Sequence, residues 1–396
     1  MSCSEWKEYR LEDICENIFS GGTPSTKNTN YWNGSIPWLS SGETRNNFIN
    51  STEKTITLDG VNNSSTKLAK KGDIVIASAG QGYTRGQTSF CNIDTYINQS
   101  LIAIRTNNAK IHNKYLYYNL KGRYDELRQL SDGHSIRGSL TTKIIKDLVI
   151  KLPSLEEQEK IANILSSLDD KIELNNEMNK TLEEMDQSIF KRWFVDFEFP
   201  NEDGQPYKSS GGEMVESELG MIPKEWKIGT LDNIGTFKNG KKIKSELRDD
   251  NGKYIIYGSN GIIGKTNEVL QNNNCIILGR VGAYCGSVQL SLEPCWITDN
   301  AIMATSKEEK YLPYLHRFLL NYPLRESAGG SAQPLINQGI LKSIITTIPT
   351  QNLFEKYYNI SKEILSKIDK NIKENNLLAE IRDSILPKLM SNEISI

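Results

Sequence analysis

Two sets of residues in this chain combine the side chains that bind nucleic acids, and both sets stand in glycine-rich segments. Arginine and lysine can donate hydrogen bonds to guanine O6 and N7, glutamine can bond adenine, and both cations neutralise phosphates. The candidates in the first half are Gln81, Tyr83, Arg85, His134 and Arg137, and those in the second half are Lys241, Lys242, Lys244, Arg280, Tyr284 and Gln333. Taken alone, each is more often an ordinary solvated surface residue, so the two sets are candidate DNA contacts and not assigned ones.

The strongest candidate for a cofactor motif is GSNGIIGKT at 258–266, which follows the strand-like segment YIIY. A phosphate-binding P-loop has the form GxxxxGK[ST], so its first glycine would stand where this chain has Ser259. No helix-forming apolar run follows Thr266, and a turn with glycines at positive φ is the better interpretation. The glycines of AGQGYTRG at 79–86 likewise miss the GxGxxG spacing of a dinucleotide site.

Other catalytic constellations are missing from the sequence as well. The NPPY or DPPY tetrapeptide typical of amino-methyltransferases does not occur, and the three histidines, His112, His134 and His316, are scattered. That spacing argues against a metal cluster or a Ser-His-Asp set. We therefore expect a binding protein with no catalytic residue and no metal ligand.

The composition indicates a globular protein inside the cell. With 37% hydrophobic residues and no apolar run long enough to span a membrane, the chain is predicted to be soluble. The N-terminal MSCSEWKEYRLED is charged and lacks the apolar core of a secretory signal. Six cysteines without a CxxC pair are typical of reduced thiols, so a cytoplasmic location is expected.

The candidate contacts need a scaffold, and the most regular part of the chain is 155–194. Its apolar and amide positions recur with alternating spacings of four and three residues, the pattern of a coiled-coil seam. Without proline or glycine, the helix could extend about 60 Å at about 1.5 Å per residue. The predicted seam residues are Ile161, Leu165, Leu168, Ile172, Asn175, Asn179, Leu182 and Ile189. The two amides cost stability in a seam but can select its register or partner.

The passage around this helix occurs twice. IIKDLVIKLP at 144–153 matches ILKSIITTIP at 340–349, and QSIFKRWF at 187–194 matches DSILPKLM at 383–390. The second copy has a predicted seam of its own: Ile364, Ile368, Ile372, Asn375, Leu378, Ile381 and Ile385.

Two such helices are natural partners for each other. We expect the helices near 155–194 and 353–386 to pack antiparallel, with Ile172 and Ile372 in a shared seam. An antiparallel pair would hold two similar bodies at opposite ends of a rod.

The predicted fold class is α+β, with two similar domains separated by two long antiparallel coiled-coil helices. EWKEYRLEDI near the start is restated by EWKIGTLDNI at 225–234, which places a second domain there. The predicted boundaries are 1–153 for the first domain, 154–195 for the first long helix, 196–220 for an acidic linker, 221–350 for the second domain and 351–396 for the second long helix. The linker is turn-rich and poor in apolar residues, as exposed connections are.

Charge is distributed unevenly along the chain. The net charge is −2, but residues 155–218 carry 17 acidic and 6 basic side chains, which leaves the remainder with 41 basic and 32 acidic ones. An acidic helix and linker between basic domains is the pattern expected if the domains touch phosphates and the helix does not.

These passages and their order resemble the specificity (S) subunit of Type I restriction-modification systems. The matching passages are the duplicated ILKSIITTIP-type strand, LEEQEKIANILSSLDDKIELNNEMN, IFKRWFVDF, YGSNGIIGKTN, NCIILGRVGAYCGSV and LPKLMSNEI, which together cover nearly the whole chain. The long-helix passage and IFKRWFVDF are the more specific ones. One departure is IRGSL at 136–140, where the second half has AQPLI at 332–336, so the matching loop of the first domain is less certain.

The resemblance implies that each domain is a target-recognition domain that reads one half of a split DNA site, and that the helices set the spacing between the halves. It also implies two modification (methyltransferase) subunits as partners, which carry S-adenosylmethionine and methylate adenine. Restriction (translocase/endonuclease) subunits would join them and cleave DNA with ATP and magnesium. The resemblance implies no cofactor and no catalysis for this chain itself.

Two rival interpretations remain. One is a coiled-coil scaffold with two protein-binding heads and no DNA binding, and the other is an NTPase built on 258–266. Gel-shift titration over a range of salt concentrations separates them, because DNA binding through phosphates weakens steeply with salt. A scaffold would bind no DNA, and an NTPase would require nucleotide.

Overall fold

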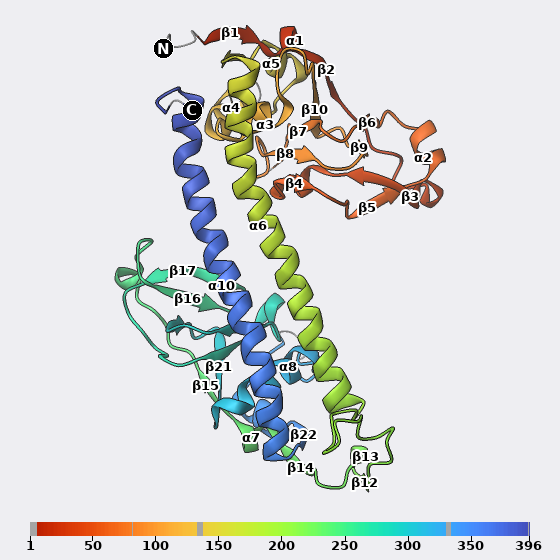
Figure 1. Ribbon diagram of the computed structural model, residues 1–396, viewed down its shortest axis with the longest axis vertical. Coiled ribbons are helices and arrows are strands. Elements are labelled where there is room, and N and C mark those ends of the chain that lie inside the picture. The colour runs from red at the N-terminus through yellow and green to blue at the C-terminus, as the bar shows by residue number, and fades with distance from the viewer. Residues whose placement is uncertain (1–5, 81, 133–137, 330–333, 395) are drawn as a thin grey trace. The chain divides into compact units, whose positions relative to one another are not determined.

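The computed structural model describes residues 6–80, 82–132, 138–329, 334–394 and 396, and a similar order of elements occurs in it twice (Figure 1). Two compact units divide the chain: Met1–Glu173 with Asn375–Ile396 form the first, and Leu174–Glu374 form the second. The division into units therefore does not follow the expected domain boundaries. It runs through both long helices, so that each helix contributes one part to each unit.

The first unit is built on two sheets. One has the strand order β2-β10-β7-β8-β4, and the other has the order β5-β3-β9-β6. Their strands are β2 (Cys15–Ser20), β3 (Trp32–Leu39), β4 (Phe48–Ile49), β5 (Lys54–Ile56), β6 (Lys67–Ala69), β7 (Ile74–Ala77), β8 (Thr88–Cys91), β9 (Thr95–Ile97) and β10 (Leu101–Thr106). Most neighbours are antiparallel, but β3 pairs with β9 in parallel.

The second unit repeats this arrangement with the sheets β15-β21-β18-β19 and β17-β16-β20, in which β16 and β20 are again parallel. Their strands are β15 (Gly235–Asn239), β16 (Tyr254–Gly258), β17 (Gly261–Thr266), β18 (Cys275–Gly279), β19 (Val288–Ser291), β20 (Cys295–Ile297) and β21 (Ala301–Ser306). Each unit also has an antiparallel two-stranded ladder, made by β1 (Lys7–Arg10) with β11 (Val149–Leu152) and by β14 (Lys227–Thr230) with β22 (Ile345–Ile348). The predicted α+β fold with two similar domains is confirmed.

The central strand of each larger sheet is buried on both faces. In β7, Ile74 and Ile76 belong to one apolar cluster, while Val75 and Ala77 belong to another. Successive side chains of a strand point to opposite faces, so a strand covered on both faces is apolar throughout. The strand β18 divides its side chains between two clusters in the same way.

Short helices cover the sheets and connect the strands. The α-helices are α1 (Leu11–Ile14), α2 (Leu58–Asn62), α3 (Asn113–Lys121), α4 (Tyr124–Asp132), α5 (Thr142–Asp147), α7 (Leu231–Ile234), α8 (Leu312–Asn321) and α9 (Gln338–Ser343), and the 3₁₀ helices are η1 (Thr29–Tyr31), η2 (Ser41–Arg45), η4 (Ser245–Leu247), η5 (Gly282–Tyr284) and η6 (Glu309–Tyr311). Helices α3 and α8 pack on the larger sheets through fully buried tyrosines, Tyr115 and Tyr314. None of the helices in the described part of the chain combines the length and apolarity that a membrane crossing requires.

The acidic segment that was expected to be an exposed linker has structure of its own. A π-helical turn, η3 (Lys191–Val195), precedes it, and the hairpin of β12 (Met214–Ser217) and β13 (Gly220–Pro223) closes it. Phe199 stacks on Tyr207 at 4.6 Å and on Trp226 at 5.6 Å between ring centroids. Trp226 belongs to the apolar cluster of the second unit and Phe199 packs against it, so these aromatic residues attach the segment to that unit despite its polar composition.

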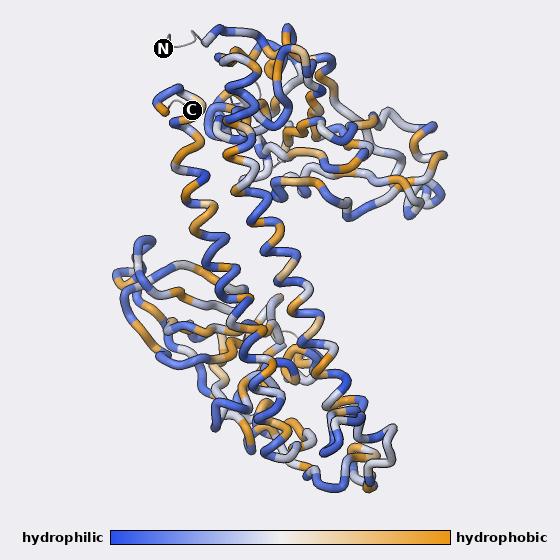
Figure 2. Tube along the Cα trace, in the orientation of Figure 1, coloured by the Kyte–Doolittle hydropathy of each residue, from blue (hydrophilic) through white to orange (hydrophobic). Residues whose placement is uncertain are grey.

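Within each unit, parts of the long helices α6 (Leu155–Phe190) and α10 (Gln351–Met390) pack antiparallel, as predicted. In the second unit, Asn175 Nδ2 donates to Glu374 Oε2 over 2.9 Å, and Asn371 Nδ2 donates to Asn179 Oδ1 over 2.7 Å. Residue numbers thus rise along α6 while those of its partners fall along α10. Figure 2 shows apolar and polar residues alternating along both helices.

The seam of α10 differs from the predicted one at two positions. Ile372 is 48% exposed and Ile381 is 39% exposed, whereas the neighbouring Asn371 and Arg382 are 1% and 7% exposed. The prediction for Ile372 is therefore wrong, because the phase of the helix and not the apolarity of each residue decides which positions face the partner. Of the other predicted seam residues, Ile161, Leu165, Asn175 and Ile364 are buried, and Leu168, Ile172, Asn179, Leu182, Ile189, Ile368, Asn375, Leu378 and Ile385 are half-buried.

Each unit encloses one buried ionic network where α6, α10 and a domain helix meet. In the first unit, Asp169 of α6 pairs with Arg382 of α10 and accepts a hydrogen bond from Tyr118 Oη of α3 over 2.8 Å. In the second unit, Asp186 of α6 pairs with Arg317 of α8 and accepts from Tyr357 Oη of α10 over 3.0 Å. The charged side chains of both networks are at most 10% exposed.

His316, next to Arg317 on α8, makes the second unit sensitive to acid. Burial, helped by the charge of Arg317, lowers the pKa of His316 to about 4 from an ordinary 6.5. Between these values the unfolded chain binds a proton that the folded unit excludes, so stability falls as the pH drops. We expect a loss of about 2 kcal/mol between about pH 7 and about pH 5, at about 1.4 kcal/mol per pKa unit.

The measurement is urea unfolding of the second unit at the two pH values, in the parent chain and in His316→Gln. The variant lacks the titrating group, so its free energy of unfolding should fall by about 2 kcal/mol less than that of the parent chain between the two pH values. An unchanged pH dependence in the variant would show that His316 is not the group that titrates.

Candidate nucleic-acid interface

The loops that carry the candidate residues emerge from one end of the sheets in each domain. Four backbone hydrogen bonds hold this end together, and we call each set of four a frame. In the first domain the bonds are Gly22 N to Ile97 O at 3.0 Å, Asn98 N to Leu39 O at 3.1 Å, Ser78 N to Ser100 O at 2.8 Å and Leu140 N to Ser78 O at 2.9 Å.

The second domain has the same frame. Its bonds are Lys241 N to Ile297 O at 2.9 Å, Thr298 N to Tyr257 O at 2.9 Å, Arg280 N to Asn300 O at 3.0 Å and Ile336 N to Arg280 O at 3.0 Å. Each bond joins the counterparts of the strands that it joins in the first domain. The two domains therefore hold corresponding loops in the same places, although the residues of those loops differ.

Three lysines and a tyrosine of the second set stand exposed on these loops. The side chains of Lys241, Lys242 and Lys244 point to solvent after β15, and Tyr284 is 49% exposed after β18. The Lys241 backbone is fixed, because its carbonyl oxygen accepts a hydrogen bond from Trp296 Nε1 over 2.9 Å. Lys244 lies 3.9 Å from the exposed Glu246, and all three lysine side chains are exposed enough to meet phosphates while the loop stays in place.

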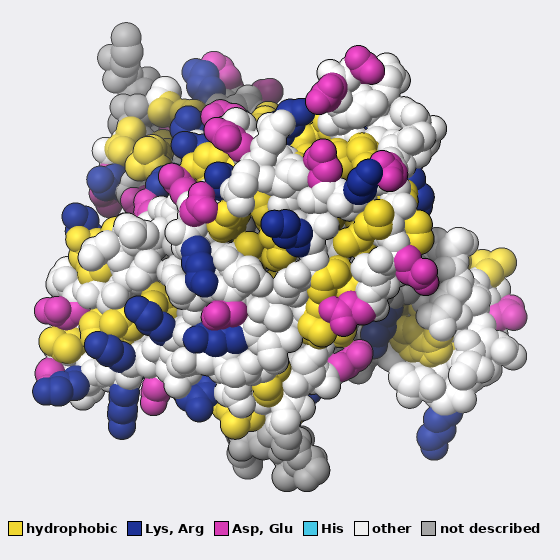
Figure 3. Space-filling model, turned by 90° about the horizontal axis from the view of Figure 1, so that it is seen from below, with side chains coloured by type: hydrophobic (Ala, Val, Ile, Leu, Met, Phe, Trp, Pro, Cys, Tyr) yellow, Lys and Arg dark blue, Asp and Glu magenta, His cyan; other side chains and the backbone are white. Residues whose placement is uncertain are grey.

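Arg280 belongs to the frame and is only half-buried. Its Nη1 donates to the Asp299 carbonyl oxygen over 3.4 Å, and its Nε has no hydrogen-bond partner among the described residues. A buried donor of this kind is costly unless a partner reaches it, so a ligand carbonyl or phosphate would be favoured there. Figure 3 shows that lysine and arginine side chains are interspersed with acidic ones over the face that it displays.

The candidates of the first set differ from one another in exposure. Tyr83 is 83% exposed, and its carbonyl oxygen accepts from Tyr124 Oη over 2.9 Å, so its ring stands on an anchored loop. Arg85 does not fit the prediction of a DNA contact, because its side chain is only 8% exposed and pairs with Asp132 of α4. Its charge is held by the carboxylate of Asp132, which is itself 61% exposed, so Arg85 belongs to an ion pair of the domain surface instead. Gln81, His134, Arg137 and Gln333 lie outside the described residues.

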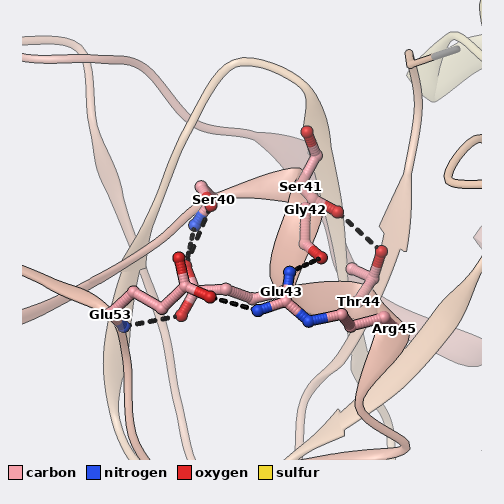
Figure 4. Close-up of polar contacts among 7 residues, drawn as sticks. All are labelled: Ser40, Ser41, Gly42, Glu43, Thr44, Arg45 and Glu53. Atoms are coloured by element: carbon pink, nitrogen blue, oxygen red, sulfur yellow. Dashed lines mark hydrogen bonds and ion pairs between the residues drawn. The ribbon is translucent and has the colours of Figure 1, made fainter. Parts of the chain in front are cut away.

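A loop that the sequence reasoning missed follows β3 in the first domain (Figure 4). Glu43 is 2% exposed, and its carboxylate accepts hydrogen bonds from Ser40 N and Oγ, both at 2.9 Å, and from Glu53 N at 2.8 Å. Arg45 bridges the outside of the loop, where it pairs with Glu53 and donates to the Gly42 carbonyl oxygen over 3.1 Å. A serine three residues before a glutamate is the capping-box pattern, which could have signalled this loop.

The corresponding segment of the second domain is the glycine-rich 258–266, and it is not a P-loop. It forms the turn and second strand of the hairpin β16–β17, with no helix after it. Gly261 and Gly264 have φ angles of 100° and 147°, as the interpretation of a glycine turn predicted. The NTPase interpretation is therefore wrong, because a P-loop needs a helix N-terminus for the phosphates.

Comparisons with known proteins identify relatives along almost the entire chain. A family model described as the Type I restriction modification DNA specificity domain matches residues 3–184 and 223–385. The MjaIX specificity subunit of a Type I restriction enzyme from Methanocaldococcus jannaschii is 29% identical over 99% of this chain and 94% of its own length. The HindI specificity subunit from Haemophilus influenzae is 24% identical over 99% of this chain and 100% of its own.

A solved structure shares the fold. The S subunit of a Type I restriction-modification system from M. genitalium superposes with a TM-score of 0.65 at 19% identity, over 98% of this chain and 96% of that one. Both matched ranges of the family model contain one of the two frames, so the repeat seen in the sequence and the repeat seen in the structure coincide.

Proposed function

The chain belongs to the family of Type I restriction-modification DNA specificity subunits, and from this premise we propose that it reads a bipartite DNA site, one half with each domain. The observation that carries the proposal is the repeated frame. Two copies of one scaffold present different loops, and different loops on a common scaffold are suited to reading two different sequences.

The charges support a DNA ligand over a protein one. Lys241, Lys242 and Lys244 stand exposed together on one anchored loop beside the frame. Cations in such a place neutralise phosphates and position a domain, while neighbouring side chains reach base edges. A scaffold that binds only proteins does not explain why three lysines stand beside Arg280, whose Nε lacks a hydrogen-bond partner among the described residues.

We infer that partner subunits perform the chemistry. Two modification subunits would supply S-adenosylmethionine and methylate adenine at the site that this chain selects. Restriction subunits would supply ATP-driven translocation and DNA cleavage with magnesium. In this proposal the chain contributes binding alone, and the acidic helix α6 remains available to partner proteins instead of DNA.

Exchange of the first domain tests the bipartite proposal. Residues 1–150 are replaced by the corresponding part of another family member, and the methylated adenines are mapped by sequencing in the host. One half of the site should change and the other should stay the same, because each domain has its own core and its own frame. A simultaneous change of both halves would show that the domains do not read DNA independently.

The salt dependence of binding separates the proposal from a DNA-free scaffold. With the modification subunit present, the affinity for a duplex containing the site should fall steeply as salt rises, since released counterions compete with the lysines. An absence of DNA binding at every salt concentration would favour the scaffold.

A further inference from the structure

The strands β3 and β16 leave their domains at equivalent points. β3 pairs in parallel with β9 through Leu39 and Ile97, and β16 pairs in parallel with β20 through Tyr257 and Ile297. The carbonyl oxygens of Leu39 and Tyr257 accept the frame bonds from Asn98 and Thr298 described above. The residues that follow β3 and β16 therefore occupy equivalent positions in the two domains, where a ligand could contact them.

The two segments that follow have opposite chemistry. In the first domain it is the polar loop of Figure 4, anchored from within by the carboxylate of Glu43. In the second domain it is the hairpin β16–β17, where Ile262 and Ile263 are 62% and 39% exposed. Two adjacent isoleucines that are exposed at a hairpin bulge do not pack in the domain's own core.

A bulge accounts for the exposure of both isoleucines. Tyr257 pairs with Ile262 and Ile256 pairs with Gly264, which leaves Ile263 as an extra residue between them. In a regular strand adjacent side chains alternate between faces, so one of the two would point inward. The bulge re-aims the side chains, a role that bulges often have beside binding sites.

Neighbouring loops fix the hairpin turn. Ser287 Oγ donates to the Ser259 carbonyl oxygen over 2.7 Å. At Gly279 an added Cβ would come within 2.1 Å of the Tyr284 carbonyl oxygen and 3.1 Å of the Ser259 carbonyl oxygen, so only glycine lets the two loops meet. The exposed isoleucines thus stand on a supported turn beside the loop of Tyr284.

The charges around the hairpin indicate what covers the isoleucines. Lys253 and Lys265 are exposed at its base beside Asp249 and Asp250, and Lys241 and Lys242 are exposed on the loop after β15. The four lysines outnumber these two carboxylates, and lysines beside exposed isoleucines fit a polyanion that also displays apolar groups. The major groove of DNA is such a surface, because it admits a two-stranded β-ribbon and displays the C5-methyl group of each thymine.

We propose that the β16–β17 hairpin enters the major groove of the half-site read by the second domain, and that Ile262 contacts a thymine methyl group there. This inference rests on the proposed function. Specificity at that base pair then comes from an apolar contact, whereas the first domain presents hydrogen-bonding groups at the corresponding place.

The test removes the methyl group from the DNA and the side chain from the protein. The full chain with its modification subunit is titrated with duplexes in which each thymine of the second half-site is replaced singly by deoxyuridine. One replacement should weaken binding roughly fourfold, equivalent to about 0.8 kcal/mol for one buried methyl-sized group. With Ile262→Ala, the same replacement should have no further effect, because the partner of the methyl group is gone.

Two controls accompany the titration. Ile345→Ala removes another exposed isoleucine of the same unit, 46% exposed in β22, and should leave the response to deoxyuridine unchanged. Deoxyuridine in the first half-site should give the same response in the parent chain and in Ile262→Ala. Because Ile262 is exposed, its alanine variant should also keep the parent's thermal unfolding.

The inference is overturned if no thymine in the second half-site responds, if that half-site has no A·T pair, or if Ile262→Ala keeps the full response. If Ile262→Ala loses binding of the modification subunit but keeps its affinity for DNA, the hairpin is instead a protein-docking element. Absence of sequence-specific DNA binding in the parent chain would count against the proposed function, so the two failures are distinguishable.

Discussion

Replacing Arg382 with methionine is expected to destabilise the first unit by about 3–5 kcal/mol, because it leaves the buried carboxylate of Asp169 without its counter-charge. Asp169 is 2% exposed at the side chain, and among the described residues the variant would leave it one hydrogen-bond donor, Tyr118 Oη. One neutral donor does not replace the water and the cation that a buried carboxylate has lost. Hydrogen exchange of amides in β7 and β10 measures the effect, since those strands form the core of this unit.

The double variant Asp169→Leu with Arg382→Met is the decisive comparison. Apolar residues of similar volume in place of a buried ion pair are often neutral or stabilising, so most of the lost stability should return. Lys224→Met is the control: it breaks an exposed ion pair with Glu213 and should not measurably change the stability. Equal destabilisation by the single and double variants would mean that packing, and not charge, makes Arg382 important.

Asp186→Arg is expected to disrupt the second unit even more strongly. It converts the position in α6 to the residue type that α10 has at the corresponding position, where Arg382 precedes DSILPKLM just as Asp186 precedes QSIFKRWF. The new guanidinium would face Arg317, whose side chain is 10% exposed, so two like charges would be buried together. The cost should exceed the roughly 3–5 kcal/mol of a broken buried pair, because repulsion adds to it.

The outcome should be confined to one unit. Amides of β18 and β21 should lose protection from hydrogen exchange, while those of β7 and β10 should keep it, because each unit has its own core. Adding Arg317→Asp restores a pair of reversed sign and should recover part of the protection. If Asp186→Arg is tolerated, the two helices are interchangeable at this position and the buried charges do not distinguish the two units.

Much of the fold could be predicted from short-range patterns in the sequence. The duplicated passages predicted two similar domains, and the sheets of the second unit repeat those of the first except for the edge strands β4 and β6. The absence of a helix pattern after 258–266 argued correctly against a P-loop, because the periodicity of a helix extends over many residues. The seam of α6 was also predicted correctly, since all eight of its predicted residues are buried or half-buried.

The candidate site was less predictable. Arg85 and the lysines of 241–244 have the same kind of sequence context, a basic residue in a glycine-containing loop, yet Arg85 is buried against Asp132. Its partner lies 47 positions away, and no local pattern connects the two residues. The loop of Glu43 was missed because an acidic residue contributes nothing to a search for DNA contacts, although it orders the loop from within.

The sequence by itself determined which elements exist and that they occur twice, because strand and helix periodicities and internal repeats are properties of neighbouring residues. Only the tertiary structure decided which side chains face a partner. Asn371 and Arg382 occupy the seam in place of Ile372 and Ile381 since packing fixes the rotation of α10. Likewise, equivalent positions beside the two frames carry a buried Glu43 in the first domain and an exposed Ile262 in the second, and the frame bonds that make these positions equivalent join residues far apart in the chain.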